Sequence, residues 1–228
     1  MQQQLGVLGM GSSTTLFYIE KLNILYHQKF GGDSTCPFKM LNANFNLFNP
    51  YLPNQYEKLV PELHRHLIAM NRLGVDKILI PNITLHQTVD HLPEDFLPKH
   101  KIIHPYELAI EKLRSENTKE VLVLGSVHTM KSRYVKEKFK QQGIKLLAPT
   151  QNEVIQIDKL RNEVYIGEST RESKLAFEQI LYKYHRKQRV LIACTELSLA
   201  LNKKNSNNFI DLATLQLQKA LDIFSENR

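Results

Sequence analysis

Short apolar runs alternate with longer segments of helical periodicity along most of the chain, and this alternation limits the possible folds. The apolar runs that we expect to form strands lie at residues 5–8, 39–45, 74–81, 102–105, 120–125, 143–147, 190–193 and 209–211. Apolar residues at helical spacing separate many of these runs, as at residues 16–26 and 62–73. Because strands that alternate with helices pair in parallel through right-handed crossovers, the sequence predicts an α/β fold.

Polar segments follow four of the predicted strands, at residues 10–15, 82–86, 126–129 and 194–196. In open α/β sheets the carboxyl ends of the strands carry the chemistry. The first two polar segments belong to the N-terminal half of the chain, and the last two belong to the C-terminal half. The stretch 91–101, which is rich in Pro, His and charged residues, is the expected boundary between the two halves.

We therefore expect two similar flavodoxin-like halves, each built on a parallel sheet of the Rossmann type. The N-terminal half is predicted to comprise residues 1–98 with 209–228, and the C-terminal half residues 99–208. Two sheets that face each other would bring the four polar segments together. The predicted active site lies in the cleft between the pseudo-symmetric halves.

Of the four polar segments, the one after residues 190–193 contains the most reactive side chain, Cys194. Thr195 suits the cap of a following helix, and Glu196 suits its positive end, either as a capping carboxylate or as a catalytic acid. A helix N-terminus can lower the pKa of a thiol and so make it a usable base or nucleophile. The alternative for this segment alone is a buried structural cysteine, since free cysteines are among the most buried residues.

The first predicted turn, Gly-Met-Gly-Ser-Ser-Thr-Thr at residues 9–15, joins a strand to a helix that Ser or Thr would cap. Such a turn collects backbone N–H groups that can hold an anion. It lacks the third glycine of the dinucleotide fingerprint, so a dinucleotide is poorly supported.

The composition argues against several other classes of protein. The formal net charge is +7, but the basic residues are spread along the chain without a zinc-finger or aromatic RNA-binding motif, so we expect no nucleic-acid partner. No apolar run approaches the ~20 residues that span a bilayer, and the N-terminus does not resemble a signal peptide. The only two cysteines, Cys36 in a predicted loop and Cys194, form no disulfide framework, so we expect a cytoplasmic protein.

Several motifs together resemble the aspartate/glutamate racemase superfamily, whose members racemise amino acids without pyridoxal phosphate. The Cys-Thr-Glu-Leu segment at residues 194–197 is the most specific match. The turn at residues 6–15, the second strand at 41–45, Gly-Ser-Val-His-Thr-Met at 125–130 and a helix pattern at 160–167 also resemble family segments. The resemblance covers nearly the whole chain, and it implies racemisation of aspartate, glutamate or a similar acidic amino acid.

Racemases of this superfamily are understood to use two cysteines on opposite faces of the substrate Cα. Where the first is expected, in Cys-Asn-Thr-x-His, this chain reads Asn82-Ile83-Thr84-Leu85-His86. An amide does not titrate, so three alternatives follow. In the first, the chain racemises with a held water or His86 in place of the first thiol. In the second, it is a one-base enzyme like the decarboxylases or isomerases of the superfamily. In the third, it binds a dicarboxylate or amino acid without turnover.

The resemblance also implies the residues of the site and its setting. Cys194 and Asn82 occupy the catalytic positions. The implied substrate-binding residues are Met10, Gly11, Asn44, Ile83, Thr84, Ser126, Thr129 and Thr195. No metal and no cofactor is implied, the partner is a small acidic amino acid, and a homodimer without membrane attachment is expected.

Overall fold

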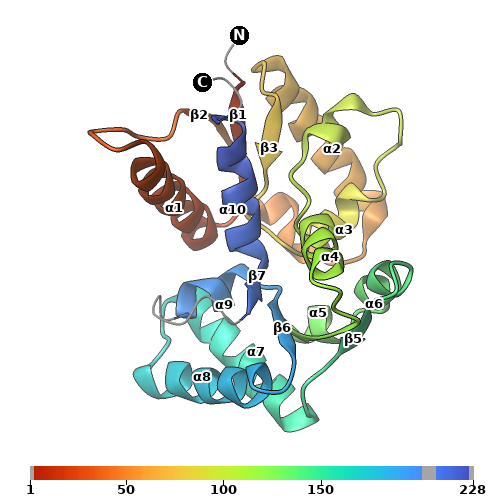
Figure 1. The fold of residues 1–228 in the computed structure, drawn as a ribbon. Helices are drawn as coiled ribbons and strands as arrows, with labels where there is room; N and C mark the ends of the chain where they lie inside the picture. Colours follow the sequence, from red (N-terminus) through yellow and green to blue (C-terminus); the bar gives the residue numbers. More distant parts are fainter. Residues whose placement is uncertain (1–2, 202–208, 226–228) are drawn as a thin grey trace. The chain divides into compact units, whose positions relative to one another are not determined.

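The computed structural model describes residues 3–201 and 209–225, which fold into two compact units. Unit 1 comprises Met1–His104 and Gln216–Arg228, and unit 2 comprises Pro105–Leu215. Each unit contains a parallel sheet flanked by helices (Figure 1). The predicted α/β class with two parallel sheets is confirmed.

Unit 1 has a three-stranded sheet in the order β2-β1-β3. Its elements are β1 (Leu5–Gly9), α1 (Ser12–Phe30), β2 (Phe38–Asn42), η1 (Phe45–Leu47), η2 (Asn49–Tyr51), α2 (Tyr56–Arg72), β3 (Lys77–Leu79), α3 (His86–Val89) and η3 (Leu97–Lys101). All five residues of β1 are buried, as expected of a central strand covered on both faces. Parallel pairing aligns Gly9 with Asn42 at the carboxyl ends of β1 and β2.

Helix α2 is amphipathic, because Leu59, Leu63, Leu67 and Met70 recur at helical spacing and are all fully buried. They form the core of unit 1 with strand residues such as Leu8. The last helix, α10 (Leu212–Asp222), ends beside α1 (Figure 1), where the Lys29 ammonium donates to the Leu221 carbonyl oxygen over 3.3 Å.

Unit 2 has a four-stranded sheet in the order β5-β4-β6-β7. Its elements are α4 (Pro105–Ser115), β4 (Glu120–Leu124), α5 (Val127–Lys131), α6 (Arg133–Lys140), β5 (Lys145–Leu147), α7 (Gln151–Ile166), α8 (Arg171–His185), β6 (Arg189–Ile192), α9 (Thr195–Ala200) and β7 (Ile210–Asp211). The buried strands β4 and β6 pair in register from Val121–Arg189 to Leu124–Ile192.

A capping box at Thr150 and Glu153 begins α7, and Gly167, with a φ of 80°, ends it. The Glu153 carboxylate also accepts hydrogen bonds from Lys183 and Tyr184 of α8, both over 2.6 Å. Burial opposes ionisation of Glu153, but the hydrogen bonds from Lys183, Tyr184 and Thr150 outweigh it and lower the pKa to about 2. This carboxylate therefore holds α7 and α8 together.

The observed elements and units differ from the sequence-based predictions in four places. Residues 99–104, predicted with the C-terminal half, lie in unit 1. Residues 102–105 form no strand; Ile102 makes a single bridge to Ile78, and α4 already begins at Pro105. Residues 209–215, predicted with the N-terminal half, lie in unit 2, because β7 pairs with β6. Helix α1 has no side-chain cap, because its cap residue is Gly11, and the Thr15 hydroxyl accepts from the Met10 N–H.

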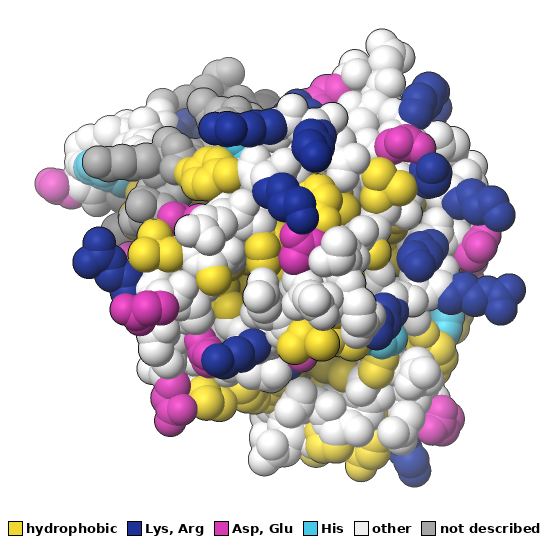
Figure 2. All heavy atoms as spheres, turned by 90° about the horizontal axis from the view of Figure 1, so that it is seen from below, with side chains coloured by type: hydrophobic (Ala, Val, Ile, Leu, Met, Phe, Trp, Pro, Cys, Tyr) yellow, Lys and Arg dark blue, Asp and Glu magenta, His cyan; other side chains and the backbone are white. Residues whose placement is uncertain are grey.

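Charge is dispersed over the surface seen in Figure 2, where Lys and Arg side chains lie among Asp and Glu side chains without merging into one basic patch. None of the helices within residues 3–201 and 209–225 combines the length and the apolar character needed to cross a membrane.

Candidate active site

Cys194 lies at the carboxyl end of β6, directly before α9, where the sequence predicts it. Its side chain is buried, with 7% of the residue exposed. The thiol Sγ donates to the Glu196 Oε2 atom over 3.0 Å, and the Thr195 hydroxyl donates to the same oxygen over 3.3 Å. The structure therefore pairs the thiol with a carboxylate two residues away.

The environment of Cys194 raises its pKa well above the usual value, first because the thiol is buried and then because the Glu196 carboxylate lies beside it. The backbone N–H groups of Leu197 and Glu196 act in the opposite direction but do not outweigh these effects. The expectation that the helix N-terminus lowers the thiol pKa is thus wrong. Thr195 is also not the helix cap; the cap position is Cys194, without a side-chain cap bond. Cys194 is a protonated thiol at neutral pH.

A second polar contact fixes the turn that carries Cys194. The Ser198 hydroxyl lies 3.2 Å from the Cys194 carbonyl oxygen and 2.6 Å from Asp211 Oδ1, and can donate to either. Asp211 also accepts from the Thr214 hydroxyl over 2.6 Å, and burial raises the pKa of Asp211. Because Asp211 belongs to β7, these bonds join the α9 turn to the neighbouring strand.

Ser126 and Thr129 lie at the carboxyl end of β4, the strand beside β6. The Ser126 hydroxyl caps α5 by accepting from the Thr129 N–H over 3.1 Å, and the two hydroxyl oxygens are 3.0 Å apart. A Cβ at Gly125 would come within 3.1 Å of the Ala193 carbonyl oxygen, so the two strand ends pack closely here. Unit 2 thus brings four predicted site residues to one sheet edge: Ser126, Thr129, Cys194 and Thr195.

The predicted residues of unit 1 lie at the carboxyl ends of its three strands. Met10 and Gly11 follow β1, and the buried Met10 N–H is already bonded to the Thr15 hydroxyl over 3.1 Å. Asn44, after β2, is exposed, and its Oδ1 accepts from the Asn46 N–H over 3.1 Å. The Met10 amide therefore has a partner within the protein, whereas the Asn44 side chain faces solvent.

The turn after β3 carries the other three predicted residues, Asn82, Ile83 and Thr84. Asn82 and Thr84 are half-buried and Ile83 is buried. The Asn82 Oδ1 atom accepts from the Leu85 N–H over 2.9 Å. Only the Nδ2 end of this amide is then able to donate to a ligand.

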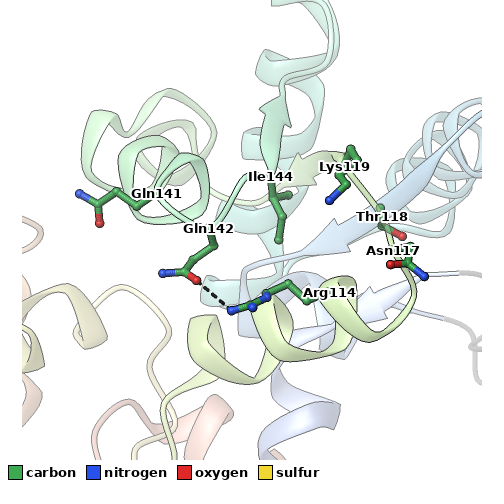
Figure 3. Close-up of a pocket in the computed structure, with 7 residues that line it drawn as sticks. All are labelled: Arg114, Asn117, Thr118, Lys119, Gln141, Gln142 and Ile144. Atoms are coloured by element: carbon green, nitrogen blue, oxygen red, sulfur yellow. Dashed lines mark hydrogen bonds between the residues drawn. The ribbon is translucent and has the colours of Figure 1, made fainter.

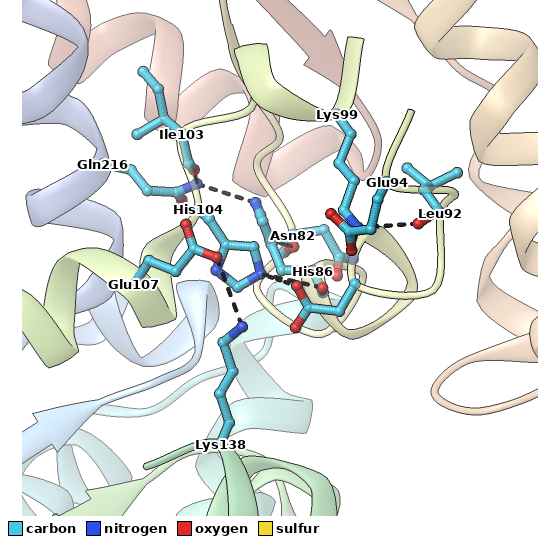
Figure 4. Close-up of polar contacts among 11 residues, drawn as sticks. Asn82, His86, Leu92, Glu94, Lys99, Ile103, His104, Glu107, Lys138 and Gln216 are labelled. Atoms are coloured by element: carbon cyan, nitrogen blue, oxygen red, sulfur yellow. Dashed lines mark hydrogen bonds and ion pairs between the residues drawn. The ribbon is translucent and has the colours of Figure 1, made fainter. Parts of the chain in front are cut away.

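His86 begins α3 directly after this turn, lies next to Asn82 (Figure 4) and is fully buried. Its Nδ1 atom is 2.9 Å from the Asn82 carbonyl oxygen, and its Nε2 atom is 3.3 Å from Gln216 Nε2. Burial, followed by the nearby His104, lowers the pKa of His86 to about 3. A buried, neutral ring with both nitrogens engaged is poorly suited to replace a missing thiol as the acid or base, whereas a water held by Asn82 or Thr84 stays an alternative.

Unit 2 contains a pocket of about 440 Å³ (Figure 3). Lys119 and Ile144, which line it, directly precede β4 and β5, so the pocket lies at the amino edge of the sheet. The Arg114 guanidinium crosses it and donates to Gln142 Oε1 over 3.1 Å. This pocket is therefore separate from the strand ends that carry the predicted site.

A thiol that donates to a carboxylate at the carboxyl edge of a parallel sheet is an arrangement that acid–base catalysis can use. The sequence profile described as Asp/Glu/Hydantoin racemase matches residues 7–220, so the chain belongs to this family of isomerases. The resemblance stated from the sequence motifs is confirmed. No curated protein matches the chain significantly.

Solved structures of racemases share the fold over almost the whole chain. An aspartate racemase homologue from Pyrococcus horikoshii OT3 is 21% identical with a TM-score of 0.81, covering 99% of this chain and 100% of the other. Aspartate racemase from Picrophilus torridus is 20% identical with a TM-score of 0.72, covering 99% and 95%. Francisella tularensis glutamate racemase, solved with D-glutamate, is 13% identical with a TM-score of 0.60, covering 99% and 82%.

Sequence reasoning did not assign a role to three of the side chains described above. Glu196 was recognised as a carboxylate near Cys194, but nothing in the sequence shows that it accepts from the thiol. Asp211 and Gln216 carried no motif, and each reaches its partner through tertiary contacts that only the folded chain reveals.

Proposed function

We propose that the protein catalyses racemisation of aspartate, glutamate or a similar acidic amino acid by proton transfer at Cα, without metal or organic cofactor. Membership of the family supports racemisation in general. The single observation that carries the proposal is the Cys194–Glu196 pair, because a thiol with a proton acceptor 3.0 Å away can both give and regain a proton.

In this proposal Cys194 serves one face of the substrate Cα. Its thiol gives its proton to the carbanion, and Glu196, which holds a proton at that stage, returns it to the resulting thiolate. In the reverse direction, Glu196 accepts the thiol proton, and the thiolate then removes the Cα proton. Neutral donors such as the Ser126, Thr129 and Thr195 hydroxyls are proposed to bind the substrate carboxylates, since donors that stabilise developing charge lower the barrier.

Asn82 is proposed to serve the opposite face in place of a first cysteine. Its amide neither gives nor takes a proton near neutral pH. Since Oδ1 already accepts from the Leu85 N–H, Nδ2 is the group that would hold a water for proton delivery. We infer that Gly11, Asn44, Ile83 and Thr84 contribute to substrate binding, and that the Met10 amide does so only if it leaves Thr15.

The amide at residue 82 also favours a second candidate function. With one titrating group, Cys194, the enzyme would protonate a carbanion on a single face, as a one-base decarboxylase or isomerase does. Such an enzyme exchanges the α-proton with solvent or releases a product without producing the other enantiomer.

The experiment is proton NMR of the purified protein with L- and D-aspartate and L- and D-glutamate in D₂O, followed by chiral analysis. Loss of the α-proton signal together with appearance of the other enantiomer, abolished by Cys194→Ala, supports racemisation. Exchange of one enantiomer without inversion supports the one-base enzyme. Absence of exchange with all four substrates overturns the acidic amino-acid proposal.

We further propose a homodimer that works in a reducing compartment such as the cytoplasm. The homodimer rests on the family resemblance alone. The compartment is supported by Cys36 and Cys194, which are both free and buried. Sedimentation of the purified protein tests the oligomeric state.

A further inference from the structure

A buried polar cluster lies behind the Asn82 turn, and the proposed chemistry does not use it. His86 and Gln216 are its centre, and both are 0% exposed (Figure 4). Gln216 comes from α10, 130 residues away in sequence from His86. Polar side chains are costly to bury unless their hydrogen bonds are made, so this arrangement requires a compensating role or partner for each group.

The partners of Gln216 fix the orientation of its amide. Its Oε1 atom accepts from the Tyr18 hydroxyl over 2.6 Å. Its Nε2 group donates to the Ile103 carbonyl oxygen over 2.7 Å, which uses one of its two N–H bonds. The remaining N–H points to His86 Nε2, 3.3 Å away. The amide is therefore satisfied only if the imidazole Nε2 is an acceptor.

This orientation determines the tautomer of His86. A neutral imidazole that accepts at Nε2 carries its proton on Nδ1. The Nδ1–H group then donates to the Asn82 carbonyl oxygen, 2.9 Å away. In the series from the Tyr18 hydroxyl through Gln216 and His86 to the Asn82 carbonyl, each donor thus faces an acceptor.

The hydrogen bond from His86 acts on Asn82, the residue proposed to serve one face of the substrate. The backbone of Asn82 is held through its carbonyl by His86, while its side-chain Oδ1 is held by the Leu85 N–H over 2.9 Å. Two hydrogen bonds therefore fix both ends of this residue, and they leave its Nδ2 group aimed in a defined direction. Such support is what a catalytic group needs to stay within a few tenths of an ångström of its working position.

We propose that His86, in its Nδ1–H tautomer set by Gln216, is a positioning residue that holds Asn82 for proton transfer at Cα. This inference rests on the proposed function. His86 does not touch the substrate; it acts through the Asn82 backbone.

Two variants of similar size distinguish the roles of the two ring nitrogens of His86. His86→Asn places an amide N–H near the original Nδ1 and can still donate to the Asn82 carbonyl. His86→Gln places its amide near the original Nε2, where it can accept from Gln216 but no longer reaches that carbonyl. Both variants remove the ring and its packing, so each is the control for the other.

The first measurement needs no substrate. Long-range ¹H–¹⁵N spectra of the imidazole report the tautomer and charge of His86 across a pH titration, in which His104 and Asp90 are the titratable groups nearby. We expect a neutral Nδ1–H tautomer from pH 5 to pH 8. An Nε2–H tautomer, or a ring that gains a proton in that range, overturns the proposal.

The second measurement compares kcat and KM for α-proton exchange in the two variants, with the folded fraction measured by thermal unfolding. We expect His86→Gln to lower kcat about tenfold or more at nearly constant KM, while His86→Asn stays close to the unmodified protein. Equal losses in both variants, or losses that follow the folded fraction alone, mean a structural role and overturn the proposal.

The failure of the proposed function is distinguishable from the failure of this inference. If the unmodified protein exchanges none of the acidic amino acids, the function fails, and hydrogen exchange of the Leu85 amide then decides whether His86 holds the turn. Faster exchange in His86→Gln than in His86→Asn supports the positioning of Asn82. Equal exchange in the two variants overturns it.

Discussion

Glu196→Gln is the most informative single change at the candidate site, because it removes the negative charge beside Cys194 and keeps the size of the side chain. A thiolate 3.0 Å from a carboxylate is repelled by about 5.5 kcal/mol in an effective dielectric of about 20. Even a quarter of that repulsion, about 1.4 kcal/mol, changes the thiolate population tenfold. The variant therefore lowers the pKa of Cys194, and alkylation at pH 8 becomes at least tenfold faster.

The same variant is expected to slow the proposed reaction. A glutamine amide cannot take the thiol proton, so α-proton exchange falls by about a hundredfold or more if Glu196 acts as the acceptor. Reactivity with iodoacetamide therefore rises while exchange falls, which loss of folding does not produce. The exposed Glu168 supplies the matched control, Glu168→Gln, which changes neither property.

Alkylation is followed by mass spectrometry, with Cys194→Ala to identify the modified residue. Burial raises the pKa of Cys36 to about 12, so this second thiol adds little signal at pH 8. If Glu196→Gln alkylates no faster than the unmodified protein, the Glu196 charge does not control the pKa of Cys194. If alkylation is faster but α-proton exchange is unchanged, Glu196 is not the proton acceptor in catalysis.

Three further predictions concern stability. Because its pKa is lowered, Glu153 contributes to stability above pH 4.5, and this contribution is lost as the pH falls toward 2. We expect Glu153→Gln to lower the free energy of unfolding by about 2–3 kcal/mol at pH 7 and to weaken the acid dependence of stability, measured by urea unfolding. Leu63→Ala costs about 2–5 kcal/mol in the same assay, whereas the 40% exposed Leu73 tolerates alanine. The raised pKa of Cys36 means that stability falls as the pH rises from 9 toward 12; Cys36→Ser removes this loss, measured by thermal unfolding.

Periodicity predicted most of the elements, because buried parallel strands and amphipathic helices leave different patterns of apolar residues. β1 and β6 are short runs buried along almost their whole length, and α2 shows its core face at every third or fourth residue. The pattern failed at residues 102–105, where Ile102 and Ile103 are buried by packing without joining a strand ladder. Burial and strand pairing are separate properties, and a short apolar run reports only burial.

The location of the candidate site was more predictable than its electrostatics. Parallel strands place their carboxyl ends at one edge, so Ser126 and Cys194 could be assigned to a common edge from sequence order. The direction of the Cys194 pKa shift could not, because it depends on burial and on a side-chain contact. Burial and Glu196 raise the pKa of the thiol, whereas the backbone N–H groups lower it, and only the folded structure shows that burial and Glu196 outweigh the N–H groups.

This outcome changes how the cysteine is expected to work. A thiolate prepared in advance by a helix terminus would be ready to remove a proton, whereas a buried thiol hydrogen-bonded to a carboxylate is ready to give one. With an amide at residue 82, a protonated Cys194 suits protonation of a carbanion better than its formation. The step that forms the carbanion is then the slower one, and a deuterium at the substrate Cα should reduce kcat in the unmodified enzyme more than deuterated solvent does.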